Sequence, residues 1–184
     1  MIRAVTAPAE DHHGRHHQDA GASVIDELIA SAAAHAAASA APLRTPRPAR
    51  RVAVVACMDA RLDLFGVLGL KPGDAHVIRN AGGVATDDVI RSLTISQRKL
   101  GTREIILVHH TDCGMLTFTD DELRRELLEE TGTKPSWAAE TFTDLDLEVR
   151  SSMQRVRLSP FLPYRDHVRG FIYDVDTGAL REIA

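Results

Sequence analysis

Short apolar runs, separated by polar or glycine-containing segments, recur along most of the chain. The first run, Val-Ala-Val-Val-Ala, covers 52–56, and similar runs cover 75–78 and 104–108. Runs of this length without polar alternation are typical of strands buried on both faces of a parallel sheet. They predict three strands of one central sheet.

Between these runs, apolar residues recur three or four positions apart, as on one face of a helix. Capping and terminating residues then predict four helices, namely 62–70, Thr86 to Gly101, Thr119 to Gly132 and Thr143 to Ser159. The end of the chain, Arg169 to Ile183, reads as a strand and a hairpin with its turn at 176–178. The alternation of strands and helices predicts an α/β fold, with a mainly parallel central sheet flanked by helices and a C-terminal edge hairpin.

The first 48 residues lack this alternation. Residues 1–21 contain His12, His13, His16 and His17 among polar residues, so we expect a disordered tail; a histidine tract can bind metal ions loosely. The alanine-rich segment 23–41 predicts a helix capped by Ser23, and the prolines of 42–48 predict an extended linker. We therefore divide the chain into a His-rich tail (1–21), a helical arm with a Pro-rich linker (22–48) and one folded domain (49–184).

Composition narrows the possible functions. A chain of 184 residues with 44% hydrophobic residues suits one domain with a hydrophobic core. Its 22 basic residues against 26 acidic ones give a net charge of −4, which argues against a nucleic-acid partner. The sequence has no apolar stretch of membrane-spanning length and no apolar leader, so we expect a cytoplasmic protein without membrane contact. In that reducing compartment, the two cysteines are expected to be ligands rather than a disulfide.

Both cysteines follow directly on apolar runs. Cys57 begins the segment Cys-Met-Asp-Ala-Arg after the first run, and Cys113 ends His-His-Thr-Asp-Cys after the third. Ligands bind at the carboxyl ends of parallel strands, so Cys57, His110 and Cys113 are expected to meet in one crevice. Two thiolates and an imidazole suit Zn²⁺, and three protein ligands leave a fourth position open, as in catalytic zinc sites.

These two segments, together with His76-Val-Ile-Arg-Asn-Ala-Gly-Gly83, resemble the β-class carbonic anhydrases. The likeness runs from about Arg51 to the C-terminus and is greatest to the short actinobacterial-type branch, although His109 and Met115 depart from the family's commoner motif. The resemblance implies a zinc enzyme that reversibly hydrates carbon dioxide to bicarbonate and a proton, through attack by a zinc-bound hydroxide. It also implies a homodimer or homotetramer, with the N-terminal helix lying across the neighbouring subunit.

Several side chains are expected to serve this chemistry. Asp59 would accept a hydrogen bond from the attacking hydroxide, with Arg61 holding the carboxylate in a bidentate pair; these two form the expected catalytic pair. In a closed, inactive state favoured by low pH, Asp59 would leave Arg61 and become the fourth zinc ligand. The backbone N–H of Gly114 would bind an oxygen of substrate or bicarbonate. His76 and His109 are candidate proton shuttles.

Other interpretations stay open. The same site could hydrolyse carbonyl sulfide or carbon disulfide, as relatives of this branch do, or zinc could serve a non-catalytic module with Asp59 permanently bound. The less specific expectations are a solvated or helix-capping Asp112, a core or interface Trp137, and Arg79 and Asn80 in a stabilising loop. The adjacent Gly82 and Gly83 predict positive φ or a close backbone approach.

Overall fold

The computed structural model describes residues 23–38 and 45–184. The chain divides into two units, Met1–Pro42 and Leu43–Ala184, and each is described by itself. The predicted tail, 1–21, lies outside the described residues, and the predicted boundaries at 21/22 and 48/49 stay predictions.

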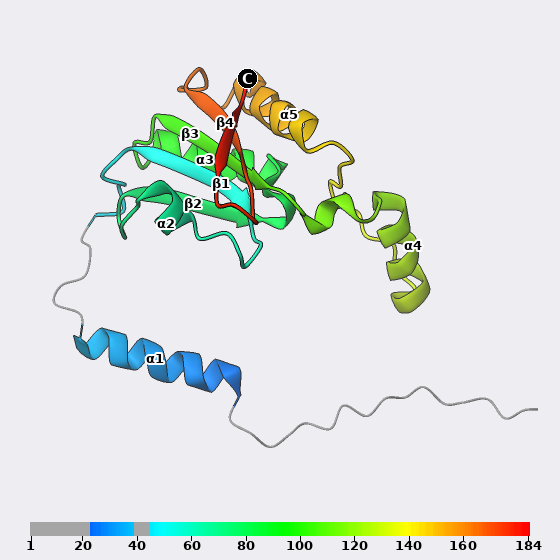
Figure 1. Ribbon diagram of the computed structural model, residues 1–184, viewed down its shortest axis with the longest axis horizontal. Coiled ribbons are helices and arrows are strands. Elements are labelled where there is room, and N and C mark those ends of the chain that lie inside the picture. The colour runs from blue at the N-terminus through cyan, green and yellow to red at the C-terminus, as the bar shows by residue number, and fades with distance from the viewer. Residues whose placement is uncertain (1–22, 39–44) are drawn as a thin grey trace, which may run out of the picture. The chain divides into compact units, whose positions relative to one another are not determined.

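The larger unit is built on a sheet of five strands in the order β2-β1-β3-β4-β5 (Figure 1). The strands are β1 (Val52–Cys57), β2 (Ala75–Asn80), β3 (Glu104–His110), β4 (Val168–Tyr173) and β5 (Leu180–Ile183). The pairs β2/β1, β1/β3 and β3/β4 are parallel, whereas β5 returns antiparallel to β4 at the sheet's edge. The predicted fold class, including the edge hairpin, is confirmed.

Helices follow the strands in the predicted order. They are α2 (Leu64–Leu68), α3 (Asp87–Arg98), α4 (Asp120–Thr131) and α5 (Leu145–Leu158), with short 3₁₀ turns η1 (Ala81–Gly83) and η2 (Gly114–Leu116). The predicted capping box of α4 is present, since the Thr119 and Glu122 side chains each accept the other residue's backbone N–H. Gly132 ends that helix in the left-handed conformation, as the sequence indicates.

Alternate side chains of the strands enter two hydrophobic clusters on opposite faces of the sheet. On one face, residues such as Val55 and Leu107 pack against apolar side chains of α3 and α5, which are Val89, Leu93, Val149, Met153 and Val156. On the other face, Val54 and Val108 pack against Leu62, Leu64, Met115 and Phe142. Because both faces are covered, β1 and the stretch 105–108 of β3 can be continuously apolar.

Several boundaries differ from the sequence prediction: α2 is shorter than the predicted 62–70, and β1 and β3 extend beyond 56 and 108. Asp144 rather than Thr143 caps α5, with its carboxylate accepting the N–H of Leu147. The α3 helix ends at Arg98, three residues before Gly101. Strand β2 continues through Arg79 and Asn80, which the sequence placed in a loop, because β1 keeps pairing with β2 as far as Cys57 opposite Asn80.

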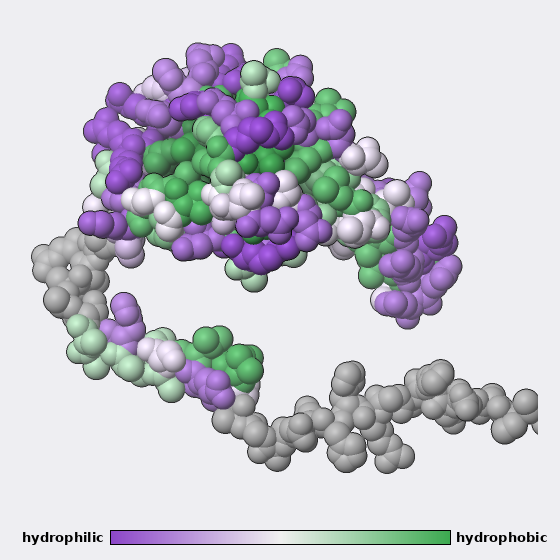
Figure 2. Space-filling model, in the orientation of Figure 1, coloured by the Kyte–Doolittle hydropathy of each residue, from purple (hydrophilic) through white to green (hydrophobic). Residues whose placement is uncertain are grey.

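Two helices bury little of their own surface. In the smaller unit, α1 (Val24–Ala38) begins where predicted, with the Ser23 hydroxyl accepting the N–H of Ile25; the predicted end of the helix, 39–41, lies outside the described residues. Its apolar side chains are more than 60% exposed at Val24, Ile25, Leu28 and Ile29, and Figure 2 shows them as an apolar group at the start of the helix. Within the described ranges, neither α1 nor α4 contains a buried residue.

A membrane-crossing helix is not found within residues 23–38 and 45–184, where each helix is too short or too polar to span the apolar layer.

Candidate metal centre

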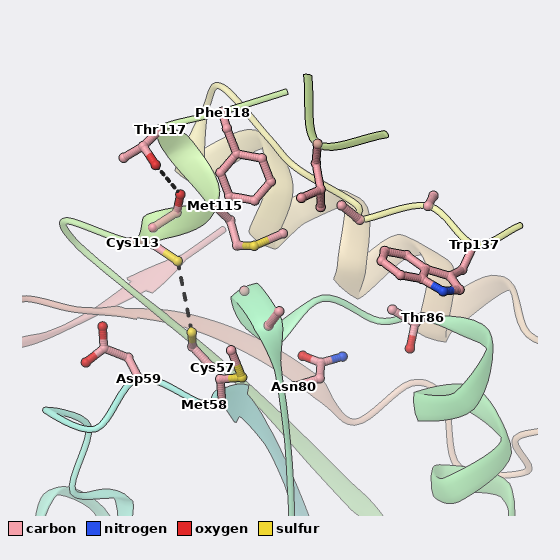
Figure 3. A pocket seen from close by; sticks show the side chains of 16 residues that line it. Cys57, Met58, Asp59, Asn80, Thr86, Cys113, Met115, Thr117, Phe118 and Trp137 are labelled. Carbon is pink, nitrogen blue, oxygen red and sulfur yellow. Dashed lines mark hydrogen bonds between the residues drawn. The ribbon is translucent and has the colours of Figure 1, made fainter. Parts of the chain in front are cut away.

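The ends of β1 and β3 place the predicted ligands side by side. Cys57 is the last residue of β1 and His110 the last residue of β3, while Cys113 follows a short turn. The two strands are hydrogen-bonded neighbours and run parallel, so their carboxyl ends lie side by side at the same end of the sheet. Figure 3 shows the sulfur atoms of Cys57 and Cys113 facing one another in this position.

The three candidate ligands are close enough to hold one metal ion. Their ligating atoms all lie within 4.8 Å of one another, and the two Sγ atoms are 4.0 Å apart. All three side chains are buried, and both cysteines are free thiols. Among the described residues this is the one group of three or more histidine, cysteine and acidic side chains with such spacing.

The hydrogen bonds of His110 suit metal binding. Its Nδ1 lies 2.8 Å from the carbonyl oxygen of Thr111, and because a carbonyl only accepts, Nδ1 carries the proton. The Nε2 lone pair is then directed toward the thiols, and this fully buried atom has no hydrogen-bond partner in the described part of the chain. A buried polar atom of this kind normally has a partner. A soft metal ion such as Zn²⁺, held by one imidazole nitrogen and two thiolates, fits the site.

The two thiols influence each other's ionisation. The hydrogen bond from Cys113 lowers the pKa of Cys57, although burial opposes this change, and His110 lowers that pKa further. The same hydrogen bond, together with burial, raises the pKa of Cys113. Burial lowers the pKa of His110, but the neighbouring Cys57, the Thr111 carbonyl and Asp59 together outweigh burial, and the pKa is raised. The site therefore already favours negative charge on Cys57, as a metal ligand requires.

Asp59 and Arg61 form the predicted bidentate pair next to these ligands. Arg61 Nε donates to Asp59 Oδ1 at 3.0 Å, and Nη2 donates to Oδ2 at 2.8 Å. These bonds hold the pKa of Asp59 well below its usual range, so the carboxylate is ionised. Asp59 Oδ2 lies 3.7 Å from His110 Nε2, which places a fixed hydrogen-bond acceptor beside the metal ligands.

Asp112 has a role that the sequence prediction missed. Arg61 Nη1 donates to the Asp112 carboxylate at 2.8 Å, and Nη2 donates to the Asp112 backbone oxygen at 3.0 Å. Asp112 adopts the left-handed conformation, with φ 53°, and Cys113 rather than Asp112 precedes the next helical turn, so Asp112 is not a helix cap. Its side chain is 77% exposed, as expected of a solvated residue, and it also binds Arg61. It connects the β1 and β3 ends of the site through Arg61.

Arg79 and Gly83 fix the backbone at the end of β1. Arg79 donates to the carbonyl oxygens of Cys57 at 2.8 Å and of Asp59 at 2.6 Å, so it has the predicted stabilising role although it lies in a strand. Gly83 has φ 74°, and a Cβ there would lie 2.8 Å from the Cys57 nitrogen. Both conditions predicted from the adjacent glycines, positive φ and close backbone approach, are met at this position.

A cavity of about 720 Å³ opens over Cys57, Cys113 and Asp59, and much of its wall is apolar. Gly114 and Thr117 line it together with the side chains of Met58, Met115, Phe118, Leu123 and Trp137. In Figure 3, Asp59 lies on one side of the two sulfur atoms, while Phe118 and Trp137 lie on the other. Trp137 is 56% exposed and is not a core residue. Its loop has no hydrophobic periodicity, so the sequence contained no signal that placed it at the site.

The two candidate proton shuttles lie elsewhere. His76 is opposite Ala53, at the start of β1, and its ring bonds to Ser96 Oγ at 2.7 Å and the Pro46 oxygen at 3.0 Å. His109 is fully buried, which lowers its pKa to about 4 and keeps it neutral at physiological pH. Neither residue lines the cavity over the metal ligands.

Comparison with known proteins adds a consistent family relationship. The family model described as carbonic anhydrase matches residues 52–180. Beta-carbonic anhydrase 1 of Mycobacterium tuberculosis is 54% identical over 161 residues, which cover 88% of this chain and 98% of that protein. A crystal structure of carbonic anhydrase from Streptococcus mutans superimposes with a TM-score of 0.81 at 44% identity, covering 89% of this chain and 99% of that one.

A second group of relatives has a different name. Carbon disulfide hydrolase of Acidianus sp. is 37% identical over 158 residues, which cover 72% of this chain and 77% of that protein. Its identity to this chain is lower than that of the mycobacterial protein, and it aligns with a smaller share of the chain.

Proposed function

The chain belongs to the β class of the carbonic anhydrase family, and from this we propose that it catalyses the reversible hydration of carbon dioxide to bicarbonate and a proton. The observation that carries the proposal is the meeting of Cys57, His110 and Cys113 beside an ionised carboxylate at the floor of an apolar cavity. Carbon dioxide is a small apolar molecule with an electrophilic carbon, which suits such a cavity.

We propose that Cys57, His110 and Cys113 are the ligands of one Zn²⁺ ion. When bound, zinc supplies Lewis acidity that lowers the pKa of water toward neutrality. The chain's contribution is to present two sulfur atoms and one deprotonated imidazole nitrogen, with His110 held in the correct tautomer by the Thr111 carbonyl.

Asp59 is the catalytic carboxylate in this proposal, and Arg61 positions it. Because Asp59 is ionised and fixed by two bonds from Arg61, its Oδ2 can accept a hydrogen bond from the attacking water and orient it toward the substrate carbon. Gly114, at the edge of the cavity next to Cys113, supplies a backbone N–H for an oxygen of substrate or bicarbonate.

The closed state stays part of the proposal. In the present arrangement Asp59 is bound to Arg61, and its Oδ2 is 3.7 Å from His110 Nε2. A small rotation would therefore bring the carboxylate among the ligand atoms, and low pH would favour this state. A low-pH crystal structure with Asp59 still on Arg61 would contradict it.

We also propose a homodimer, or a homotetramer built from dimers, located in the cytoplasm. The exposed apolar face of α1 supports association, because such surface is normally covered by a partner. Both Cys57 and Cys113 must stay reduced to serve as zinc ligands, which fits a reducing compartment such as the cytoplasm.

The experiment that tests the function compares wild type with Asp59→Ala. Both are loaded with zinc, and zinc content and the rate of carbon dioxide hydration are measured. We expect the variant to retain zinc and lose about 10–100-fold in rate, the usual effect of removing a group that orients a metal site. Asp121→Ala, which removes an exposed carboxylate of α4, is the matched control and should hydrate at the wild-type rate.

The rival functions give different results in the same experiment. A non-catalytic zinc module with Asp59 as fourth ligand would show no hydration in the wild type, and Asp59→Ala would lose zinc affinity. A parallel assay of hydrogen sulfide release tests hydrolysis of carbon disulfide and carbonyl sulfide. Turnover of either compound faster than carbon dioxide hydration would favour the hydrolase instead.

A further inference from the structure

A second cavity, of about 410 Å³, opens at the amino ends of the parallel strands, whereas the metal centre lies at their carboxyl ends. Arg51 precedes the first residue of β1 and Arg103 precedes the first residue of β3, and both line this cavity. Because β1 and β3 are parallel, Cys57 and His110 lie at the far ends of the same strands (Figure 1). The two cavities share no lining residue.

Three arginine residues, Arg47, Arg51 and Arg103, line the second cavity without an acidic residue among its walls. In the described segments, none of the three forms an ion pair with a carboxylate. Some other arginines are paired with carboxylates; for example, Arg50 lies 3.4 Å from Asp74, and Arg181 lies 2.7 Å from Asp146. All three arginines are solvent-exposed, so they give this cavity a local positive charge, although the net charge of the chain is −4, and such a charge attracts anions.

One wall of the cavity is held rigidly. Gln97 is 4% exposed, and its amide forms two bonds to the backbone of Tyr164, donating to the oxygen and accepting from the nitrogen, each at 3.0 Å. The Tyr164 ring lies beneath the guanidinium group of Arg103, whose Cζ is 5.5 Å from the ring centroid. The planar face of Arg103 is thus fixed by the aromatic ring.

Arg51 has an unusual backbone for its residue type. Its φ is 54°, in the left-handed region that favours glycine. Two backbone bonds fix this conformation: Arg51 N–H donates to the Pro48 oxygen at 3.1 Å, and Arg103 N–H donates to the Arg51 oxygen at 2.7 Å. Glycine would adopt this backbone conformation more easily than arginine. The presence of arginine here therefore supports a functional role for its side chain.

We propose that this second cavity binds a small phosphate-bearing molecule. The planar fork of a guanidinium group matches two phosphate oxygens, and three arginine residues line this one cavity. A phosphate monoester carries a charge of about −1.5 to −2 at pH 7, which offsets more of the arginine charge than a single carboxylate does. The cavity has the volume of a small-molecule site, and Leu100 and the Tyr164 ring offer surface for an apolar part of the ligand.

The test is calorimetric titration of the full-length, zinc-loaded protein with phenyl phosphate at low salt, and with benzoate as the carboxylate probe. We expect saturable binding of one phenyl phosphate per chain, and at least tenfold weaker binding of benzoate. Arg51→Gln and Arg103→Gln should each weaken phenyl phosphate binding tenfold or more. Arg125→Gln, which removes the same charge from exposed α4, should change the dissociation constant less than twofold.

Three outcomes would overturn the proposal. They are the absence of saturable binding to wild type, an equal loss in Arg125→Gln, and unchanged affinity in Arg51→Gln and Arg103→Gln, which would place the anion elsewhere, including at the metal centre.

Arg51→Gly separates binding from folding. Glycine suits the left-handed backbone, so the thermal midpoint should equal or exceed that of wild type. The variant should nevertheless lose phenyl phosphate binding because the guanidinium group is gone. A folded Arg51→Gly protein that binds phenyl phosphate as tightly as wild type would contradict the proposal.

Discussion

At the scale of single residues, Arg61 determines the direction of the Asp59 carboxylate. Asp59 Oδ1 accepts both the backbone N–H and Nε–H of Arg61, and Oδ2 accepts from Nη2. The remaining donor, Nη1, is bound to Asp112. The guanidinium group is therefore held from both sides, which leaves the carboxylate little freedom to rotate.

Replacing Arg61 should disturb orientation more than charge. In Arg61→Gln the pKa of Asp59 rises back toward its ordinary value, but that value is still below neutral pH, so Asp59 stays ionised in the assay. We expect an unchanged zinc content and a fall in kcat for carbon dioxide hydration of about 10–100-fold. Asp112→Asn keeps the bonds to Asp59 and serves as the milder control. A wild-type kcat in Arg61→Gln would refute the positioning role.

Glu148 makes stability depend on pH. Burial raises its pKa above 4.5, against the hydrogen bond that its carboxylate accepts from Ser152. Since the folded state holds the proton more tightly than the unfolded state, the stability contribution is present below about pH 4.5 and is lost as pH rises through the folded pKa. Glu148→Gln mimics the protonated side chain, so its thermal midpoint should exceed that of wild type at pH 7.

The pH dependence provides the check on this expectation. The difference in thermal midpoint between Glu148→Gln and wild type should shrink between pH 7 and pH 4.5, as measured by circular dichroism. A difference that stays the same across this range would show that the titration of Glu148 does not contribute.

At the scale of elements, the packing of α5 on the sheet depends on a glycine in β4. A Cβ at Gly170 would overlap Val149 and lie 2.9 Å from Met153 Sδ, and both side chains are buried in the core. The absence of a side chain lets the helix approach the strand closely. This contact also supports the site, because β4 pairs with β3, the strand that carries His110.

Gly170→Ala should therefore destabilise the protein by about 1–3 kcal/mol, the usual cost of overpacking a close-packed core. Denaturant unfolding measures the change. Combining it with Val149→Ala removes the overlapping atom, so the double variant should lose less stability than the sum of the two single variants. Strict additivity would contradict this packing explanation.

The elements that could be predicted from the sequence are those with local signals. The apolar runs of β1 and β3 and the capping box of Thr119 and Glu122 depend on neighbouring residues, and each predicted the observed element. Asp144 and Thr143 are both good caps, so propensity alone could not choose between them. The extension of β2 through Asn80 comes from pairing with β1, which is a tertiary effect.

The candidate site likewise contains some residues that could be predicted from the sequence and others that could not. Cys57, His110 and Cys113 could be predicted because each follows a recognisable strand and carries a distinctive ligand atom. The bond from Arg61 to Asp112 could not, because it depends on a left-handed turn at an aspartate. Trp137 could not be placed either, since its loop reaches the cavity through tertiary packing.

At the scale of the whole molecule, two cavities with different linings lie at opposite ends of the parallel strands. The carboxyl ends carry the thiols, His110 and Asp59 beneath an apolar cavity, while the amino ends carry the arginine-lined cavity. The proposed association of chains would cover the exposed apolar residues of α1. At the carboxyl ends of the strands, we expect the three ligands and the Asp59–Arg61 pair to form the site where carbon dioxide is hydrated.

Stopped-flow measurement of carbon dioxide hydration tests this claim most directly. Full-length protein of known zinc content is assayed from about pH 6 to pH 9, with protein stripped of zinc as the control. We expect the rate of carbon dioxide hydration to require zinc and to rise with pH as water at the site becomes deprotonated. Fully zinc-loaded protein that gives no hydration above the uncatalysed rate anywhere in this range would contradict this claim.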